Sequence, residues 1–289
     1  MVTGKTSKVG LRVTIGLLIV FSIVWVFPII FTILESFRPY GDVLKYGAAS
    51  WPQHLTFSNY INALVQSHMW SFFLNSVEVA VPAVFLTLFL ASMIAFVLSR
   101  YESRWNVALL MVFTAGNLLP PQLLFIPLFR LYLKIPVPHF LNENGVLYDT
   151  QLGLVLVHVA VQLGFATFVL TNFLRTIPKE ISESALVDGA NVWQHYWKII
   201  FPLLRPALAS LGVLMTTWIY NDFFWSVVLL KSGAKRPITA ALSNLQGLYN
   251  TDYNLLAAGA VLAFLPTLFV FFSMRKHFVA GLTLGSTKG

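Results

Sequence analysis

Long apolar runs separated by short polar segments dominate this chain of 289 residues. A helix needs roughly 20 apolar residues to cross the hydrocarbon core of a bilayer, so each long run is a candidate membrane span. The runs of sufficient length are Val13–Leu34, Phe72–Leu98, Asn106–Phe129, Gln151–Phe173, Ala207–Leu230 and Leu255–Met274. The pattern predicts an all-α, polytopic membrane protein with six transmembrane helices.

The composition agrees with this class. Hydrophobic residues make up 57% of the chain, charged residues only 10%, and the mean hydropathy is +0.74. A soluble domain carries about 25% charged residues. The chain contains no cysteine, which excludes a disulfide framework, a thiolate metal site and a thiol nucleophile. We expect no metal, no catalytic residue and no cofactor bound to this chain, and no nucleic-acid partner.

The first apolar run could be a cleaved signal peptide. Its apolar core is too long for that class, and no A-x-A cleavage site closes it. We therefore expect a retained membrane anchor.

Basic residues indicate the orientation, because they gather in cytoplasmic loops. With the N-terminus inside, the cytoplasmic segments hold twelve: Lys5, Lys8, Arg12, Arg100, Arg104, Arg175, Lys179, Lys198, Arg205, Arg275, Lys276 and Lys288. The outer segments hold seven: Arg38, Lys45, Arg130, Lys134, Lys231, Lys235 and Arg236. The bias predicts two cytoplasmic termini, with a membrane domain over residues 13–274, a cytoplasmic loop over 174–206, and terminal segments over 1–12 and 275–289.

The loop between the fourth and fifth spans has a helical pattern of its own. Pro178 suits the first turn of a helix, and the carboxylates that follow suit the helix dipole. Small residues recur at helical spacing and are expected to share one smooth face that another protein could approach closely: Ser182, Ala185 and Gly189. A second short helix over about Val192 to Ile200 carries aromatic residues and is expected to end at Pro202 and Pro206. From physics alone, a hairpin lying on the bilayer is an equally good interpretation.

A resemblance favours the docking interpretation. Glu183, Ser184 and Ala185, then Gly189, then Ile199 and Pro202 resemble the motif E-A-A, three residues, G, nine residues, I-x-L-P. This EAA motif marks membrane subunits of bacterial ATP-binding-cassette importers. Ser184 replaces the second alanine and Phe201 the leucine, with the spacing intact. The segments FLNSVEVA, LPPQLLFIPLFRLYL, YNDFFWSVVLL and HFVAGLTLGSTKG are similar to the carbohydrate-uptake branch, and more closely to the maltose-type second permease subunit.

The resemblance implies a bacterial inner-membrane permease subunit that transmits force and is not itself an enzyme. Its partners would be a second permease subunit in a heterodimer, two copies of a cytoplasmic ATPase that bind ATP and Mg, an extracytoplasmic solute-binding protein, and membrane lipid. The residues expected to couple to the ATPase are Glu183, Ser184, Ala185, Asp188, Gly189, Ile199 and Pro202. The chain has no G-x-x-x-x-G-K-[ST] phosphate loop, which agrees with ATP binding by a partner. Transport would proceed by alternating access.

Polar side chains inside spans are costly and usually face the bundle interior or water. Together with two tryptophans, they predict a solute pathway lined by Asn117, Gln122, Gln162, Trp218, Asn221, Asp222 and Trp225. Trp218, Asp222 and Trp225 follow at i, i+4 and i+7, so they are expected to share one face of the fifth helix, which would suit a sugar. Equally, the tryptophans could only pack between helices and Asp222 could cap a network. His158 is expected to be a hydrogen-bonded packing residue, and Glu78 to reach water. Pro120 and Pro121 are expected to break the third span.

The absence of Lys or Arg deep in a span favours a neutral sugar, such as a di- or oligosaccharide, over a glycerol-phosphate-type solute. Two other functional classes fit the sequence less well. An intramembrane enzyme would need a convergent catalytic set, and no H-E-x-x-H is present. An ion-coupled secondary carrier would usually show internal repeats, and none is clear.

Overall fold

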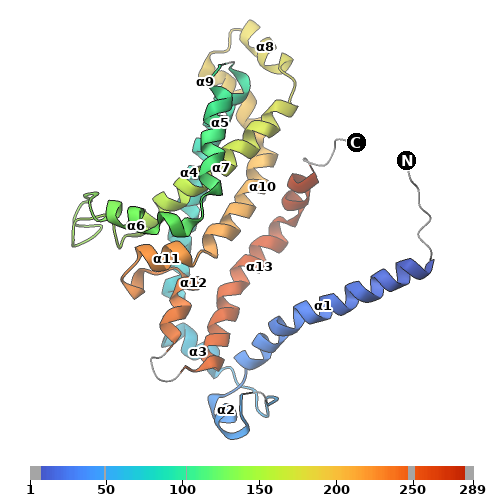
Figure 1. Cartoon of the computed structure of the whole chain (residues 1–289), viewed down its shortest axis with the longest axis vertical. Helices are drawn as coiled ribbons and strands as arrows, with labels where there is room; N and C mark the ends of the chain where they lie inside the picture. Colours follow the sequence, from blue (N-terminus) through green and yellow to red (C-terminus); the bar gives the residue numbers. More distant parts are fainter. Residues whose placement is uncertain (1–7, 49, 102, 247–250, 284–289) are drawn as a thin grey trace. The chain divides into compact units, whose positions relative to one another are not determined.

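The computed structural model describes residues 8–48, 50–101, 103–246 and 251–283, and its regular structure over these ranges is helical (Figure 1). The first helices are α1 (Lys8–Ser36), α2 (Tyr40–Tyr46), α3 (Ser58–Val65), α4 (Met69–Arg100), α5 (Asn106–Ala115), α6 (Pro121–Tyr132) and α7 (Gln151–Thr176). The remaining helices are α8 (Glu180–Val187), α9 (Val192–Gln194), α10 (Phe201–Tyr220), α11 (Phe224–Leu229), α12 (Ile238–Ala241) and α13 (Tyr253–Thr283). The expected all-α class is confirmed.

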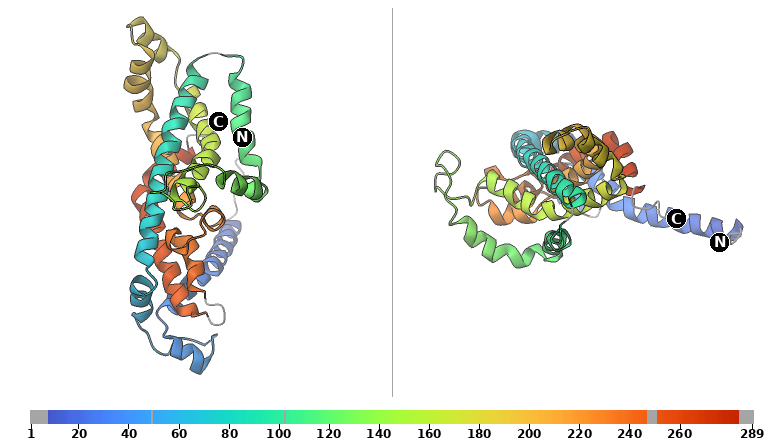
Figure 2. Two further views of the ribbon diagram at one scale, coloured as in Figure 1. Left: turned by 90° about the vertical axis from the view of Figure 1, so that its left-hand side faces the viewer. Right: turned by 90° about the horizontal axis from the view of Figure 1, so that it is seen from above.

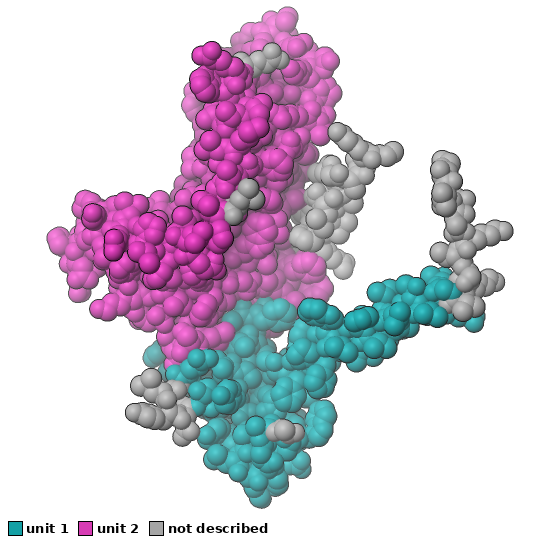
Figure 3. Space-filling view, in the orientation of Figure 1, with its two compact units in different colours: residues 1–69, 245–264 teal, residues 70–244, 265–289 magenta. Residues whose placement is uncertain are grey.

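The chain divides into two compact units (Figure 3). Unit 1 comprises residues 1–69 and 245–264, and unit 2 comprises residues 70–244 and 265–289. Every residue predicted for coupling or for the solute pathway lies in unit 2. The predicted terminal segments are described only in part, because residues 1–7 and 284–289 lie outside the described ranges. α13 continues to Thr283, nine residues beyond the expected end of the sixth span.

Five helical segments in the described residues are long and apolar enough to cross a membrane: Gly10–Ser36, Met69–Arg100, Gln151–Thr176, Val192–Tyr220 and Tyr253–Ser273. They correspond to five of the six expected spans. The third expected span is not a single helix. α5 ends at Ala115, a 3-10 turn η1 covers Gly116–Leu118, and α6 begins at Pro121.

The break in the third span has a local cause. Leu119 is extended (φ −77°, ψ 124°), as expected for a residue that precedes a proline, and Pro121 occupies the first turn of α6. Figures 1 and 2 show α6 running across the direction of α5. The break therefore lies at the Pro120–Pro121 pair, as the sequence predicts.

The fifth span differs from its expected bounds at both ends. The loop helix does not stop at Pro202 and Pro206, which corrects that expectation. α9 passes into a π-helical segment, η2 (His195–Ile200), and η2 passes directly into α10. The Phe201 N–H donates to the Tyr196 carbonyl, five residues back, and this wider turn precedes Pro202 in the first turn of α10. α10 ends at Tyr220 rather than at Leu230.

Unit 2 has two hydrophobic cores. The first joins α4, α7 and α11 around Val79, Leu154 and Trp225. The second joins α4, α7, η2 and α10 around Phe96, Leu170 and Ile200. α8 and α9 lie at one end of the unit, and α12 lies toward the other (Figure 1). The loop hairpin, formed by α8, α9 and η2, is attached to the second core through η2.

Candidate functional site

The first helix of the predicted coupling loop, α8, is ended by Gly189. The N–H of Gly189 donates to the carbonyl of Leu186 (3.0 Å), and the N–H of Ala190 donates to the carbonyl of Ala185 (3.0 Å). This pair of bonds is the Schellman motif, and it requires the left-handed conformation that Gly189 adopts (φ 80°). Gly189 therefore lies beyond the helix and does not form part of a continuous helical face, which corrects the expected geometry.

The small residues of α8 face inward. Ser182 and Ala185 are buried, and α8 contacts η2, the π-helical segment that follows it. Apolar side chains are exposed elsewhere on the helix, with Val187 87% exposed, Leu186 51% and Ile181 40%. At 100° per residue these three point in different directions, and Val187 lies on the outward side beside the exposed Glu183 and Ser184. The face expected to receive a partner is thus occupied within the chain, and Leu186 and Val187 are the most exposed apolar residues of α8.

The second part of the hairpin is built to stay in place. Asn191 and Gln194 form a capping box, with each side chain accepting from the other residue's backbone N–H (2.9 and 3.0 Å). Tyr196 and Ile200 are buried in the second core, and the Tyr196 hydroxyl pairs with Ser92 of α4 (2.6 Å). His195 is buried edge-on against Phe96. Movement of the hairpin must therefore be transmitted to α4.

The other predicted coupling residues divide by position. Glu183, Ser184 and Asp188 are exposed on or directly after α8, and Ser184 donates to the Glu180 carbonyl within the same helix (2.8 Å). Ile199 and Pro202 are half-buried where η2 enters α10.

Asp222 interrupts the fifth span and caps the helix that follows. Its carboxylate accepts from the N–H of Trp225 (3.3 Å), and from the N–H and hydroxyl of Ser226 (both 3.0 Å). The carboxylate also lies 3.8 Å from Nε2 of His158, and the Asp222 carbonyl accepts from Thr239 (2.8 Å). The structure therefore favours the interpretation in which Asp222 caps a network that joins α7, α11 and α12.

The two tryptophans do not share a face with Asp222, which corrects the i, i+4, i+7 expectation. The prediction assumed an unbroken helix, whereas α10 ends at Tyr220 and α11 begins at Phe224. Trp225 is 4% exposed and belongs to the first core. Trp218 is 43% exposed and lies beside the ring of Phe165, with the centroids 5.3 Å apart.

The amides of the predicted pathway lie at separate contacts. Asn117 donates to the Phe113 carbonyl (3.1 Å) at the break in the third span, and Asn221 donates to Thr217 (2.8 Å) and to Thr267 of α13 (3.3 Å). The exposed Gln122 and the half-buried Gln162 lie on α6 and α7.

Sequence reasoning missed Gly164, where α5 approaches α7. A Cβ atom at this position would lie well inside contact distance of the Phe113 carbonyl and 2.6 Å from Nδ2 of Asn117. A glycine inside an apolar span is itself a signal for close helix packing. This contact fixes the broken third span against the fourth.

Sequence reasoning also missed Asp149, which lies two residues before α7 in a left-handed conformation (φ 62°). Its carboxylate accepts from the N–H and hydroxyl of Ser232 (2.9 and 2.6 Å) and pairs with Lys235 (3.4 Å). Burial raises the pKa of Asp149, but these hydrogen bonds and the Lys235 charge outweigh it, so the pKa is lowered. Asp149 thus joins the start of α7 to the loop after α11.

We expect Asp222→Ala to lower the stability of the purified chain by about 1 kcal/mol, because the cap of α11 is lost. Uptake should fall with it. Asp222→Asn is the matched control, since asparagine caps helices as well as aspartate does. It should retain the melting temperature and most of the uptake. If the Asn variant transports as poorly as the Ala variant while melting normally, the carboxylate acts on the solute and the cap is secondary.

Comparisons with known proteins agree with the family resemblance that the sequence indicated. Residues 83–283 match the family described as binding-protein-dependent transport system inner membrane component. The chain is 32% identical over 274 residues to the diacetylchitobiose uptake system permease protein NgcG of Streptomyces coelicolor, covering 94% of this chain and 87% of that protein. It is 29% identical to the arabinooligosaccharides transport system permease protein AraQ of Halalkalibacterium halodurans, covering 99% of each.

A solved structure shares the fold. One chain of a bacterial ABC transporter involved in the import of the acidic polysaccharide alginate matches with a TM-score of 0.76 and 23% identity, covering 96% of this chain and 99% of that chain. The resemblance indicated by the segment from Glu183 to Pro202 is thereby confirmed. The chain is a multi-pass membrane protein and belongs to the family of binding-protein-dependent transport system inner membrane components.

Proposed function

We propose that this chain is one of two permease subunits of an ATP-driven sugar importer and forms half of its transmembrane pathway. The broken third span would complete the six crossings, with both termini in the cytoplasm. A second permease, two ATPase subunits that hold ATP and Mg, and an extracytoplasmic binding protein would complete the assembly. The chain itself would transmit force between the ATPases and the pathway.

The observation that carries the proposal is the construction of the loop hairpin. α8 packs its small residues on η2, and η2 buries Tyr196 and Ile200 between α4, α7 and α10. Leu186 and Val187 at the end of α8 stay exposed. A helix that is held against a core by its small residues and leaves apolar side chains uncovered suits a lever driven by another subunit.

A di- or oligosaccharide is the proposed solute. The relatives NgcG and AraQ are named for the uptake of a disaccharide and of oligosaccharides. In the sequence, the deep parts of the spans carry amides, hydroxyls and aromatic rings rather than lysine or arginine, which suits a neutral sugar.

The proposal is tested by producing the tagged chain together with the other subunits encoded with it. The chain alone in liposomes should hydrolyse no ATP. The assembly should copurify a nucleotide-binding subunit, and its ATPase rate should rise when the solute-loaded binding protein is added. ATP hydrolysis by the pure chain, or uptake by the pure chain driven by an ion gradient, would overturn the division of labour.

A further inference from the structure

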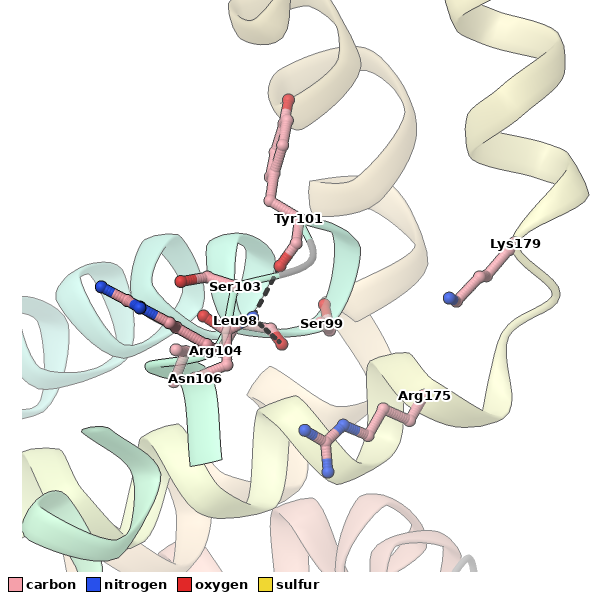
Figure 4. Close-up of a pocket in the computed structure, with 8 residues that line it drawn as sticks. All are labelled: Leu98, Ser99, Tyr101, Ser103, Arg104, Asn106, Arg175 and Lys179. Atoms are coloured by element: carbon pink, nitrogen blue, oxygen red, sulfur yellow. Dashed lines mark hydrogen bonds between the residues drawn. The ribbon is translucent and has the colours of Figure 1, made fainter. Parts of the chain in front are cut away.

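A pocket of about 590 Å³ lies where the end of α4, the start of α5 and the end of α7 meet. Its basic lining residues are Arg104, Arg175 and Lys179. Figure 4 shows Arg175 and Lys179 directed toward the turn between α4 and α5. We infer that this pocket binds the phosphate headgroup of an anionic phospholipid. This lipid would be a bound ligand and not the transported solute. The inference rests on the proposed orientation, in which this end of unit 2 is cytoplasmic.

The charge of the pocket favours an anion. Three cations line it, together with Ser99 and Ser103, whereas the Tyr101 hydroxyl points away from the turn (Figure 4). Arg175 and Lys179 lie on one side of the turn, and Arg104 points to the other side. The turn also contains Glu102, which lies outside the described residues, so the lining keeps a positive excess even if that carboxylate is counted. Basic pockets at the cytoplasmic ends of membrane helices recognise anionic headgroups through such residues.

The walls of the pocket are fixed by hydrogen bonds. The side chain of Asn106 donates to the carbonyl of Tyr101 (2.6 Å) and to that of Leu98 (3.3 Å), which closes the turn between α4 and α5 (Figure 4). Arg100 donates to the carbonyl of Ile177 (3.2 Å) and joins the end of α4 to the residue after α7. The site is therefore preformed, and a headgroup would not have to order it.

An apolar helix face leads away from the pocket. α5 begins at Asn106 in the pocket wall, and none of its residues is buried within the chain. Its exposed side chains include Val107 (57%), Met111 (63%) and Val112 (71%). Ten residues of helix span roughly 15 Å, about the depth of one leaflet. Acyl chains could follow this face while the phosphate occupies the pocket.

An aromatic residue stands at the same boundary. Trp105 is 60% exposed, and the Arg104 guanidinium lies 5.3 Å from the centre of its ring. Tryptophan is enriched where the headgroups meet the hydrocarbon, which places the pocket at headgroup level. The juxtaposition of cations, an interfacial ring and an apolar helix face favours a lipid over a water-soluble phosphate or an acidic protein surface.

The test measures lipid binding to the full purified chain by native mass spectrometry. The probes are dioleoylphosphatidylglycerol and dioleoylphosphatidylcholine, with soluble glycerophosphoglycerol as the headgroup alone. The variant is Arg104→Gln with Arg175→Gln. The control is Arg130→Gln with Lys134→Gln, which removes one exposed charge from α6 and one from the turn after it. The conservative variant Arg175→Lys checks that lost binding reflects lost charge rather than lost fold.

Phosphatidylglycerol should bind more tightly than phosphatidylcholine. The double variant in the pocket should lower the affinity for phosphatidylglycerol about thirtyfold, because two cations near the headgroup are lost. The control pair and Arg175→Lys should bind nearly as the wild type does. Equal weakening by both pairs, equal binding of the two lipids, or equally tight binding of the soluble headgroup would overturn the inference.

A fourth outcome distinguishes a protein partner. If Arg104→Gln with Arg175→Gln prevents capture of the ATPase subunit but leaves phosphatidylglycerol binding unchanged, the pocket is a docking site for that subunit and the lipid inference is wrong. The proposed function would survive this result. It fails separately, if the wild-type assembly captures no ATPase at all.

Discussion

Replacing Gly164 by alanine is expected to abolish uptake by preventing stable assembly of the membrane domain. The new methyl group would overlap the backbone carbonyl of Phe113, an atom that cannot move aside as a flexible side chain can. α5 must therefore shift away from α7 or the helices must separate. Overpacking of this kind costs typically 1–3 kcal/mol, and we expect about 3 kcal/mol or more here because the clash is with backbone. Membrane abundance and the melting temperature of the purified chain measure it.

Gly212 provides the control, because it is also a glycine in a membrane helix. A Cβ atom there would meet only a methyl group of Leu88 at 3.5 Å, which is ordinary contact. Gly212→Ala should therefore leave abundance, melting and uptake near the wild-type values. Normal melting of Gly164→Ala would show that α5 does not pack on α7 in the membrane as it does in this structure.

Removing the exposed apolar side chains at the end of α8 is expected to separate ATP hydrolysis from transport. Leu186→Ser with Val187→Ser removes the most exposed apolar side chains of the helix without touching its buried face. Burial of each large aliphatic side chain is worth about 1.5–3 kcal/mol. Losing both should weaken association with the ATPase on the order of a hundredfold, since each 1.4 kcal/mol is a factor of ten. Uptake should be lost while the chain reaches the membrane at its normal level.

The matched control keeps both positions apolar with Leu186→Met and Val187→Ile, and it should transport normally. A melting temperature unchanged in both double variants would confirm that the effect is on association rather than on folding. Full uptake with the serine pair would show that the ATPase contacts the chain elsewhere, and the coupling proposal for α8 would have to be abandoned.

The membrane class, the loop helix and the family could be predicted from the sequence because each depends on local pattern. Apolar runs of sufficient length indicate the spans, and the residue spacing from Glu183 to Pro202 identifies the EAA motif. Pro120 and Pro121 were sufficient to predict the break in the third span, since a proline restricts both itself and the residue before it. The pattern did not predict which residues of the loop helix are covered.

Which residues of the loop helix are covered was decided by the tertiary structure. Spacing alone placed Ser182, Ala185 and Gly189 on one open face, but η2 packs against α8, and Gly189 ends the helix with a positive φ. Helical spacing predicted that Trp218 and Trp225 flank Asp222 on one helix. In the structure the Asp222 carboxylate caps α11, a separate helix, so this arrangement does not form. Helical periodicity shows which side chains share a side of one helix. Which of those sides is buried depends on contacts between residues far apart in the sequence, and these exist only once the helices are packed.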